Sequence, residues 1–374
     1  MAAVGAETDG MHILHVVGAR PNFMKVAPVL HALGKRAGVR QTLVHTGQHY
    51  DANMSDVFFE QLGIPAPDVN LGVGAGSHAR QTAEIMSRFE PVVLEYKPDL
   101  VLVYGDVNST VAAALVCAKL LIRVGHVEAG LRSFDRTMPE EINRLVTDQL
   151  ADLLFTHSED ADVNLHREGV AAEKIHLVGN VMIDSLHQFL PLAKQSPIVD
   201  QLGLTKNGKI VPFAVLTLHR PSNVDSLEVL GGLLRAIHAV ADQVIVIFPV
   251  HPRTRLKLDQ LKTGTHPRLR VIDPLGYLEF LSLMSCAQLV LTDSGGIQEE
   301  TTGLGVPCLT LRENTERPIT VAVGTNNLVG QNANVIESTA REILSGRGKQ
   351  GRQPDLWDGQ TANRIVDILL RELS

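Results

Sequence analysis

The sequence predicts an α/β protein built from two doubly wound parallel-sheet domains. Short apolar runs of strand type recur along both halves of the 374-residue chain, and helix-like segments lie between most of them. Strands that are apolar throughout are typical of a parallel sheet covered by helices on both faces. Two such series indicate two domains, for which a chain of this length has room.

The strand-type runs locate the two domains. In the first half they read HILHVVGA, QTLVHTG, LVLVYGD, IRVGHVEAG, LLFTHSE and IHLVGN. In the second half they read FAVLTLH, VIVIFPV, LRVIDP, QLVLTDSG, VPCLTL and NNLVG. The stretch 191–209 is the most polar and broken region near the middle. We therefore place an N-terminal domain at 1–182 and a C-terminal domain at 183–356, followed by an amphipathic helix, TANRIVDILLREL, with no strand after it.

Composition and charge exclude several classes of protein. Hydrophobic residues make up 44% and charged residues 20%, which is typical of a packed globular chain. A net charge of −7 argues against a nucleic-acid partner. The three cysteines show no CxxC spacing, so reduced thiols are expected. The first ten residues do not resemble a signal peptide, and no apolar stretch reaches the roughly 18 residues of a membrane span. We expect a cytoplasmic protein without membrane insertion.

Polar residues gather where the predicted strands end. Open α/β sheets bind ligands beyond the carboxyl ends of their strands. The residues found there are Arg20 and Lys25 after the first strand, then Asp106, Glu128, His219, Arg220 and His251 after later ones. Because both domains show this pattern, a ligand cleft between them is expected. No group of His, Cys and Asp has the spacing of a metal site.

The segment LVLTDSGGIQEETTGLG predicts an anion site. Ser294, Gly295 and Gly296 follow a strand and open a helix, whose free N–H groups can bind a phosphate. A tight turn without a ligand explains the glycines equally well. Glu300 would repel a phosphate but could accept hydrogen bonds from two ribose hydroxyls. A nucleotide diphosphate therefore fits better than a bare phosphate.

Three carboxylates are candidates for acid–base chemistry. Asp106 and Glu128 end successive predicted strands, and carboxylates in different environments can divide acid and base roles. Asp106 also precedes a helix that it could cap. Glu140 has a rival explanation, since Thr137-x-x-Glu140 has the spacing of a capping box. Structural roles are the alternative for His219 and His251, and salt bridges for Arg20, Arg144 and Arg317.

Several long motifs, in order, resemble the non-hydrolysing UDP-N-acetylglucosamine 2-epimerases. They are GARPNFMKVAPVL, TGQHYD, GDVNST, GHVEAGLRS, PEEINR, LTLHRPSNVD and TDSGGIQEETTGLGVPCLTLRENTERP. The resemblance runs from about residue 12 to the C-terminus. It implies a GT-B fold of two Rossmann-like domains, with UDP bound mainly by the second and the C-terminal helix, 357–374, packed back on the first. A homodimer is also expected.

The resemblance implies a role for each site residue. Asp106, Glu128, Glu140 and His219 would be catalytic. The UDP-sugar would be bound by Arg20, Lys25, Arg144, His251, Phe280, Ser294, Gly295, Gly296, Glu300 and Arg317. Phe280 matches the aromatic position beside uracil, although core packing explains it equally well. No metal and no cofactor are expected.

The implied reaction is reversible epimerisation of UDP-N-acetylglucosamine (UDP-GlcNAc) to UDP-N-acetylmannosamine (UDP-ManNAc). Anti elimination of UDP would give a 2-acetamidoglucal intermediate, and readdition would give the epimer. Alternatives are a UDP-2,3-diacetamido-glucuronic acid 2-epimerase and a GT-B UDP-sugar glycosyltransferase. A hydrolysing relative and a catalytically silent nucleotide-sugar sensor are further possibilities.

One pair of motifs departs from part of the family. Many bacterial members are activated by UDP-GlcNAc and carry QHxxQ and HRREN motifs. Here Gln48 and His49 are kept, but Ala52 stands at the position of the second glutamine, beside Asp51, and the second motif reads HRPSN with Pro221 and Ser222. An aspartate would repel a diphosphate, and the change at Pro221 removes a cationic donor. We therefore expect no activation by UDP-GlcNAc.

Overall fold

The computed structural model describes residues 10–47, 63–261 and 266–373. The chain forms two compact units. Unit 1 comprises residues 1–185 and 355–374, and unit 2 comprises residues 186–354. The division after Ser185 falls inside helix α7, Val181–Ala193. The sequence-based join at 182/183 falls within the same helix.

Unit 1 contains a parallel sheet that has seven strands in the described part of the chain. The strand order is β3-β2-β1-β4-β5-β6-β7. The strands are β1 Met11–Val17, β2 Val39–His45, β3 Val69–Asn70, β4 Leu100–Tyr104, β5 Arg123–Ala129, β6 Leu153–Thr156 and β7 Ile175–Leu177. Residues of β4 are all buried, as expected for a central parallel strand rich in leucine and valine.

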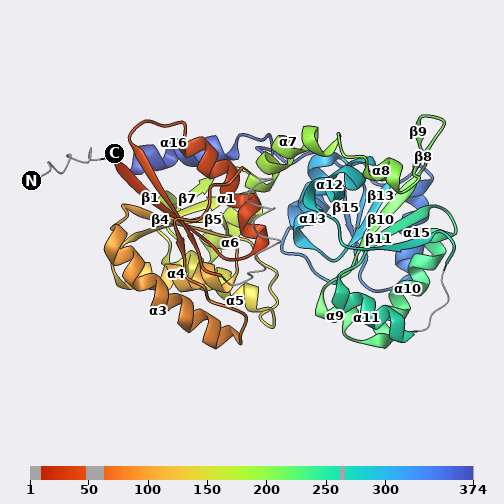
Figure 1. Cartoon of the computed structure of the whole chain (residues 1–374), viewed down its shortest axis with the longest axis horizontal. Coiled ribbons are helices and arrows are strands. Elements are labelled where there is room, and N and C mark those ends of the chain that lie inside the picture. Colours follow the sequence, from red (N-terminus) through yellow and green to blue (C-terminus); the bar gives the residue numbers. More distant parts are fainter. Residues whose placement is uncertain (1–9, 48–62, 262–265, 374) are drawn as a thin grey trace, which may run out of the picture. The chain divides into compact units, whose positions relative to one another are not determined.

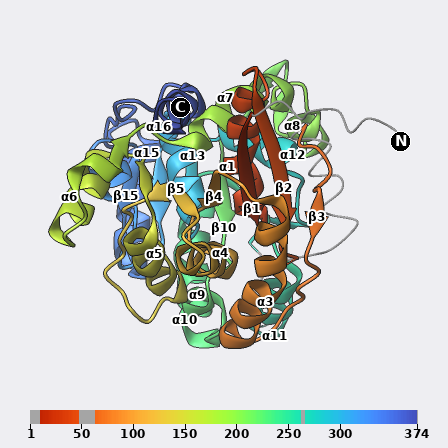
Figure 2. The same cartoon turned by 90° about the vertical axis from the view of Figure 1, so that its left-hand side faces the viewer.

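Helices cover both faces of this sheet. They are α1 Arg20–Leu33, α3 His78–Tyr96, α4 Asn108–Lys119, α5 Pro139–Leu150, α6 Glu159–Arg167, α7, α16 Thr361–Leu373 and the short 3₁₀ helix Ala172–Lys174. Figures 1 and 2 show α3, α4 and α5 on one face and α1 with α16 on the other. Helix α3 illustrates the local causes: Ser77 caps its start, and Ile85, Phe89 and Val93 recur at four-residue spacing and are buried.

The C-terminal segment is anchored within unit 1. The carboxylate of Asp184 accepts backbone hydrogen bonds from Thr361 (3.1 Å) and Ala362 (2.7 Å), at the first residues of α16. The indole of Trp357, the one tryptophan in the sequence, is buried and donates to the carbonyl of His157 at 2.9 Å. Capping and aromatic burial thus fix α16 beside α1.

Unit 2 repeats the plan with a parallel sheet that has six strands in the described ranges, in the order β12-β11-β10-β13-β14-β15. They are β10 Phe213–Thr217, β11 Ile245–Pro249, β12 Leu269–Ile272, β13 Leu289–Thr292, β14 Cys308–Thr310 and β15 Asn326–Leu328. A small antiparallel hairpin joins β8, Thr205–Lys206, to β9, Lys209–Ile210. Parallel sheets between helices in both units confirm the predicted α/β class.

The helices of unit 2 again lie on both faces of the sheet. They are α8 Ile198–Gln201, α9 Pro221–Val224, α10 Leu227–Ala241, α11 Pro252–Leu261, α12 Tyr277–Cys286, α13 Gly295–Leu304, α14 Pro318–Ala322 and α15 Ala333–Leu344. Helix α10 packs beside α15, and α12 beside α13 (Figure 1). The core is formed by leucine, isoleucine and valine side chains of α10, α15 and the strands. None of the helices in the described ranges combines the length and apolar character that a membrane span requires.

Candidate functional site

Several predicted site residues follow strands at the topological switch points. In unit 1 the strand order reverses between β1 and β4, and in unit 2 between β10 and β13. Crossover helices leave in opposite directions at such a point and open a crevice beyond the strand ends. Asp106 follows β4, His219 follows β10 and Ser294 follows β13. These three residues therefore lie at the carboxyl edge of each sheet, as the sequence pattern predicted.

Glu128 forms a buried ion pair with Lys25. The Nζ of Lys25, in α1, lies 2.8 Å from each carboxylate oxygen of Glu128, at the end of β5. Glu128 has a φ of +74°, beside a break in register between Val127 and Ala129. A positive φ is unfavourable for glutamate and recurs at functional sites, where the surroundings hold it. A Cβ at Gly105 would lie 2.7 Å from the Nζ of Lys25, and the φ of +63° at this position also favours glycine.

Arg144 connects two acids of unit 1. Its guanidinium is buried and donates through Nη1 to Glu141 at 2.6 Å and through Nη2 to Asp106. The Asn143 side chain donates to the backbone carbonyl of Asp106 at 2.9 Å. Asp106 and Glu128 are thus each paired with a cation, which favours the ionised carboxylate.

The predicted capping box at Thr137 is wrong. Helix α5 begins at Pro139, its N-cap is Met138, and the Thr137 hydroxyl donates to Asp135 instead. Glu141 takes the anchoring role that spacing had assigned to Glu140. It accepts hydrogen bonds from the backbone N–H and hydroxyl of Ser133 and from the Phe134 N–H, at 2.9 to 3.0 Å. Proline suits the first helical position, which displaces the start of the helix.

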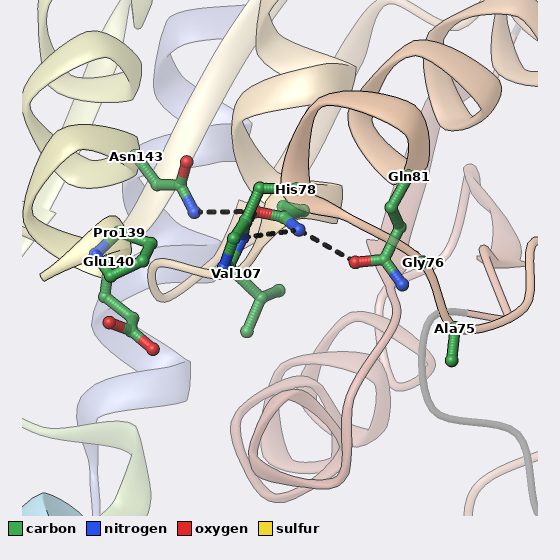
Figure 3. A pocket seen from close by; sticks show the side chains of 9 residues that line it. Ala75, Gly76, His78, Gln81, Val107, Pro139, Glu140 and Asn143 are labelled. Atoms are coloured by element: carbon green, nitrogen blue, oxygen red, sulfur yellow. Dashed lines mark hydrogen bonds between the residues drawn. The ribbon is translucent and has the colours of Figure 1, made fainter. Parts of the chain in front are cut away.

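Glu140 lines a cavity of about 260 Å³ in unit 1 (Figure 3). The described residues around it are Ala75, Gly76, His78, Gln81, Val107, Asn108, Pro139, Glu140 and Asn143. Side-chain amides are linked along its wall, since Asn143 donates to Asn108 at 3.2 Å and Asn108 to Gln81 at 2.8 Å. This lining contains one carboxylate and no lysine or arginine. It suits a polar, uncharged group.

In unit 2, the SGG motif opens helix α13. Ser294 is the N-cap residue, but its side chain does not cap the helix. The first N–H groups of a helix have no intrahelical acceptor and form an anion site. A Cβ at Gly295 would lie 2.5 Å from Nη1 of Arg317 and 2.8 Å from Oε1 of Glu316. Glycine is needed here because side chains pack against the backbone.

Arginines gather beside this helix start. Glu316 lies 2.6 Å from Arg317, 2.9 Å from Arg312 and 3.7 Å from the partly exposed Arg220. Arg317 also pairs with the fully buried Glu299 at 3.0 Å. Guanidinium groups at a helix N-terminus favour an anionic ligand.

Glu300 is held by a tyrosine that the sequence analysis did not single out. Tyr277, the first residue of α12, donates its hydroxyl proton to Glu300 at 2.9 Å. Burial raises the pKa of Glu300 to about 7, and the Tyr277 hydrogen bond offsets part of that effect. Phe280, on the next turn of α12, is partly exposed.

His219 is paired with Asp293. The imidazole Nδ1 lies 2.8 Å from a carboxylate oxygen of Asp293, which also accepts the backbone N–H groups of His219 and Arg220. Burial raises the pKa of Asp293, but the hydrogen bonds and charge of His219 outweigh it and hold the pKa below its usual value. With Nδ1 donating, Nε2 is the nitrogen that can reach a ligand. His251 follows β11 and is exposed.

The structure does not describe every predicted site residue. Arg20 begins α1, but its side chain is not described, and Gln48, His49 and Asp51 lie outside the described residues. Conversely, Asp293, Glu316 and Tyr277 were missed. Asp293 carried a usable signal, because it ends a strand just as Asp106 follows one. Tyr277 carried none, since its partner Glu300 is 23 positions away, whereas Glu316 stands beside Arg317 and four positions after Arg312, a charge spacing that the sequence contained.

No cluster of three or more His, Cys, Asp or Glu in the described ranges is arranged to hold a metal ion.

Similarity to known proteins identifies the family. Residues 31–370 match the family described as UDP-N-acetylglucosamine 2-epimerase. The UDP-N-acetylglucosamine 2-epimerase of Methanocaldococcus jannaschii is 43% identical over 367 residues, covering 96% of this chain and 99% of the relative. The UDP-2,3-diacetamido-2,3-dideoxy-D-glucuronate 2-epimerase of Pseudomonas aeruginosa is 44% identical over 364 residues, covering 96% and 100%.

Solved structures agree with the sequence match. The M. jannaschii UDP-GlcNAc 2-epimerase in complex with UDP-GlcNAc and UDP superimposes with a TM-score of 0.87 at 42% identity, covering 96% of this chain and all of that one. The Neisseria meningitidis enzyme bound to UDP-GlcNAc gives a TM-score of 0.86 at 32% identity, with 96% and 100% coverage. These matches confirm the predicted GT-B fold class and the predicted enzyme class, an isomerase. The chain belongs to the UDP-N-acetylglucosamine 2-epimerase family.

Proposed function

We propose that this enzyme interconverts UDP-GlcNAc and UDP-ManNAc without a cofactor. One observation carries the proposal: two carboxylates, Asp106 and Glu128, stand at the ends of adjacent strands β4 and β5, each paired with a cation. Such carboxylates are ionised at neutral pH and can take up a proton. Glu140, which lines the nearby cavity, supplies a third carboxylate in a different environment.

Unit 2, residues 186–354, binds the UDP in this proposal. The N–H groups after Ser294 and the guanidinium of Arg317 bind the diphosphate. Glu300 accepts hydrogen bonds from the ribose hydroxyls, and Phe280 packs against the uracil. Support comes from the arginines gathered at the start of α13 and from the hydrogen bond between Tyr277 and Glu300.

The chemistry requires a proton to leave carbon 2 of the sugar and to return on the opposite face. As a carboxylate takes that proton, the C–H electron pair forms the double bond between carbons 1 and 2. The bond from carbon 1 to the diphosphate oxygen breaks, and UDP leaves with its electron pair. Arg317 and the N–H groups of α13 stabilise the charge on the departing UDP. Protonation from the other face and readdition of UDP give the epimer.

The cavity lining favours an uncharged sugar over a uronic acid. The P. aeruginosa relative is named for a glucuronate, so this substrate is the second candidate. Around the cavity beside Glu140, the described residues present amides and His78 but no lysine or arginine. A sugar carboxylate here would lie near Glu140 without a cation to balance it. The N-acetyl group and hydroxyls of GlcNAc instead match the amides of Gln81, Asn108 and Asn143.

The test is incubation with UDP-GlcNAc in deuterium oxide without added NAD, followed by NMR. Conversion toward UDP-ManNAc with deuterium at carbon 2 is expected, because the returning proton comes from solvent. Product without label would contradict the elimination. UDP-2,3-diacetamido-glucuronic acid is assayed in parallel, and turnover of it alone would change the substrate assignment.

Two further predictions concern the oligomeric state and the cellular location of the enzyme. A homodimer and a cytoplasmic location, both expected from the sequence, stay predictions. Light scattering coupled to size-exclusion chromatography distinguishes a dimer from the 40.6 kDa monomer.

A further inference from the structure

We propose that His126, acting with Asp148, is a positioning residue that holds the backbone beside both Asp106 and Glu128. The inference rests on the function proposed above for these two acids. His126 touches neither carboxylate in this assignment. It acts through the turns that carry them.

His126 lies in β5 and is fully buried. Its Nε2 is 2.8 Å from the backbone carbonyl oxygen of Gly105, the residue before Asp106. Its Nδ1 is 2.6 Å from Oδ1 of Asp148, in α5. The other oxygen of Asp148 accepts the backbone N–H of Gly130 at 3.1 Å, two residues after Glu128. The pair therefore bridges the turn after β4 and the turn after β5.

Geometry determines the hydrogen-bond roles of this pair. A carbonyl oxygen can only accept, so Nε2 of His126 must donate to Gly105. Asp148 also pairs with Nη1 of Arg132 at 2.7 Å. Burial raises the pKa of Asp148, but His126 and Arg132 outweigh it and hold the pKa below its usual value. The ionised carboxylate of Asp148 thus holds the ring at Nδ1.

Arg132 extends the pair to a second carboxylate. It donates to both oxygens of Glu168, at 2.7 and 2.5 Å, and pairs with Asp148 at 2.7 Å. Asp148 is fully buried, so the loss of a group that pairs with it leaves a buried charge without compensation.

The turns held by the pair have unusual backbone angles. Gly105, Glu128 and Gly130 all have positive φ, at +63°, +74° and +79°. The N–H of Gly105 also donates to the carbonyl of Val127 at 3.0 Å, so both polar groups of this glycine are bound to β5 or its side chains. Holding Gly105 and Gly130 keeps the acids in register with each other. Because the proposed function assigns the UDP mainly to unit 2, affinity for UDP should depend little on these turns.

The hydrogen bond to Gly105 is tested on the wild-type enzyme by NMR of ¹⁵N-labelled histidine. Because Nε2 of His126 faces a carbonyl oxygen, this nitrogen should carry a proton and show one-bond coupling to hydrogen. Assignment uses the spectrum of His126→Gln. An Nε2 without a proton would overturn this hydrogen bond, and with it this inference.

The positioning role is tested by a pair of variants and a matched control. In His126→Gln the amide nitrogen can donate to Gly105, but the amide oxygen then faces the carboxylate of Asp148 and is repelled. We therefore expect kcat to fall at least ~100-fold, while the affinity for UDP stays within ~3-fold of wild type. Adding Asp148→Asn replaces that repulsion with an amide pair and should recover kcat by ~10-fold. His12→Gln is the control, since His12 is buried in the same sheet but at the start of β1. It should lower stability without lowering kcat.

Three results would contradict the role. They are an unchanged kcat in folded His126→Gln, an equal loss of kcat in His12→Gln, and no recovery in the double variant. Absence of epimerisation by the wild-type enzyme would instead overturn the proposed function, and with it the premise of this inference. The wild-type assay therefore separates the two failures.

Discussion

Asp293 fixes the orientation of His219 by accepting a hydrogen bond from its Nδ1 at 2.8 Å, and Nε2 is left as the nitrogen that can meet a ligand. The carboxylate is fully buried and the imidazole is half exposed. This arrangement is typical of a histidine that transfers a proton, because the carboxylate selects the tautomer and stabilises the imidazolium.

Asp293→Asn should therefore lower kcat for UDP-GlcNAc by about 100-fold, the scale of lost acid–base catalysis. The amide can still accept the backbone hydrogen bonds of His219 and Arg220, so the variant should fold. Asp242→Asn is a suitable control, because Asp242 forms an exposed pair with His266 in the same unit, at 3.0 Å. A kcat within ~3-fold of wild type in Asp293→Asn would contradict the role.

Affinity for UDP should rise with pH as Glu300 ionises. Burial raises the pKa of Glu300 to about 7, and only the carboxylate accepts hydrogen bonds from both ribose hydroxyls. The affinity is therefore lost as pH falls through 7. In Tyr277→Phe the pKa of Glu300 should rise further, because the lost hydrogen bond lowers it in the wild type. Calorimetric titration with UDP between pH 5.5 and 8.5 should show the transition displaced to higher pH.

Glu300→Gln is the control for that measurement, since the terminal phosphate of UDP titrates in the same range. The pH dependence that persists in this variant belongs to the phosphate. An unchanged profile in Glu300→Gln would remove Glu300 from ribose recognition.

Neighbouring glutamates at the start of α5 should respond differently to the same substitution. Glu140 lines the cavity and forms no hydrogen bond or ion pair with the described residues. Glu140→Gln should therefore lower turnover at least ~100-fold but lower the free energy of unfolding by less than about 1 kcal/mol. Glu141 is buried and binds Ser133, Phe134 and Arg144. Glu141→Gln should therefore destabilise the fold by about 3 kcal/mol.

Urea unfolding and steady-state kinetics on both variants show which glutamate serves catalysis and which serves stability. A stability loss confined to Glu140→Gln would reverse the assignment.

Asp106→Asn and Glu128→Gln should also lose at least ~100-fold in turnover while UDP affinity changes far less.

Stability should fall as pH drops below 6.5, partly because of His15. This side chain is fully buried between Tyr104 and Gln41, and burial lowers its pKa from 6.5 to about 3. The unfolded chain binds a proton in this range and the folded chain does not, so unfolding becomes easier by about 1.4 kcal/mol per pH unit between 6.5 and 3. His15→Asn should show a shallower decline of the urea midpoint between pH 7.5 and 5. His166→Gln, at an exposed position, should keep the wild-type slope.

The reverse reaction should start without a lag. Ala52, Pro221 and Ser222 depart from the motifs of the many bacterial members that UDP-GlcNAc activates, and Asp51 adds a negative charge beside Ala52. Pure UDP-ManNAc should therefore be converted at once, and traces of UDP-GlcNAc should not change the initial rate. A lag that UDP-GlcNAc abolishes would show that other residues compensate, by a coupling energy of ~1–3 kcal/mol.

The sequence by itself determined the two parallel sheets and the edge of each sheet that carries polar groups. Apolar runs report burial on both faces, and a residue at the end of such a run must lie at the edge of the sheet. Asp106, Glu128, His219 and Ser294 were found in this way. These inferences succeed because they depend on neighbours in the chain.

Only the tertiary structure decided which groups are paired. Lys25 and Glu128 are 103 positions apart, and Asp106 and Arg144 are 38 apart, so no spacing rule connects them. The predicted capping box failed for the same reason: Thr137 and Glu140 had the local spacing of a cap, but Ser133, Phe134 and Arg144 converge on Glu141 instead. Ion pairs and hydrogen bonds depend on distance through space, and that distance is set only when the strands and helices have packed.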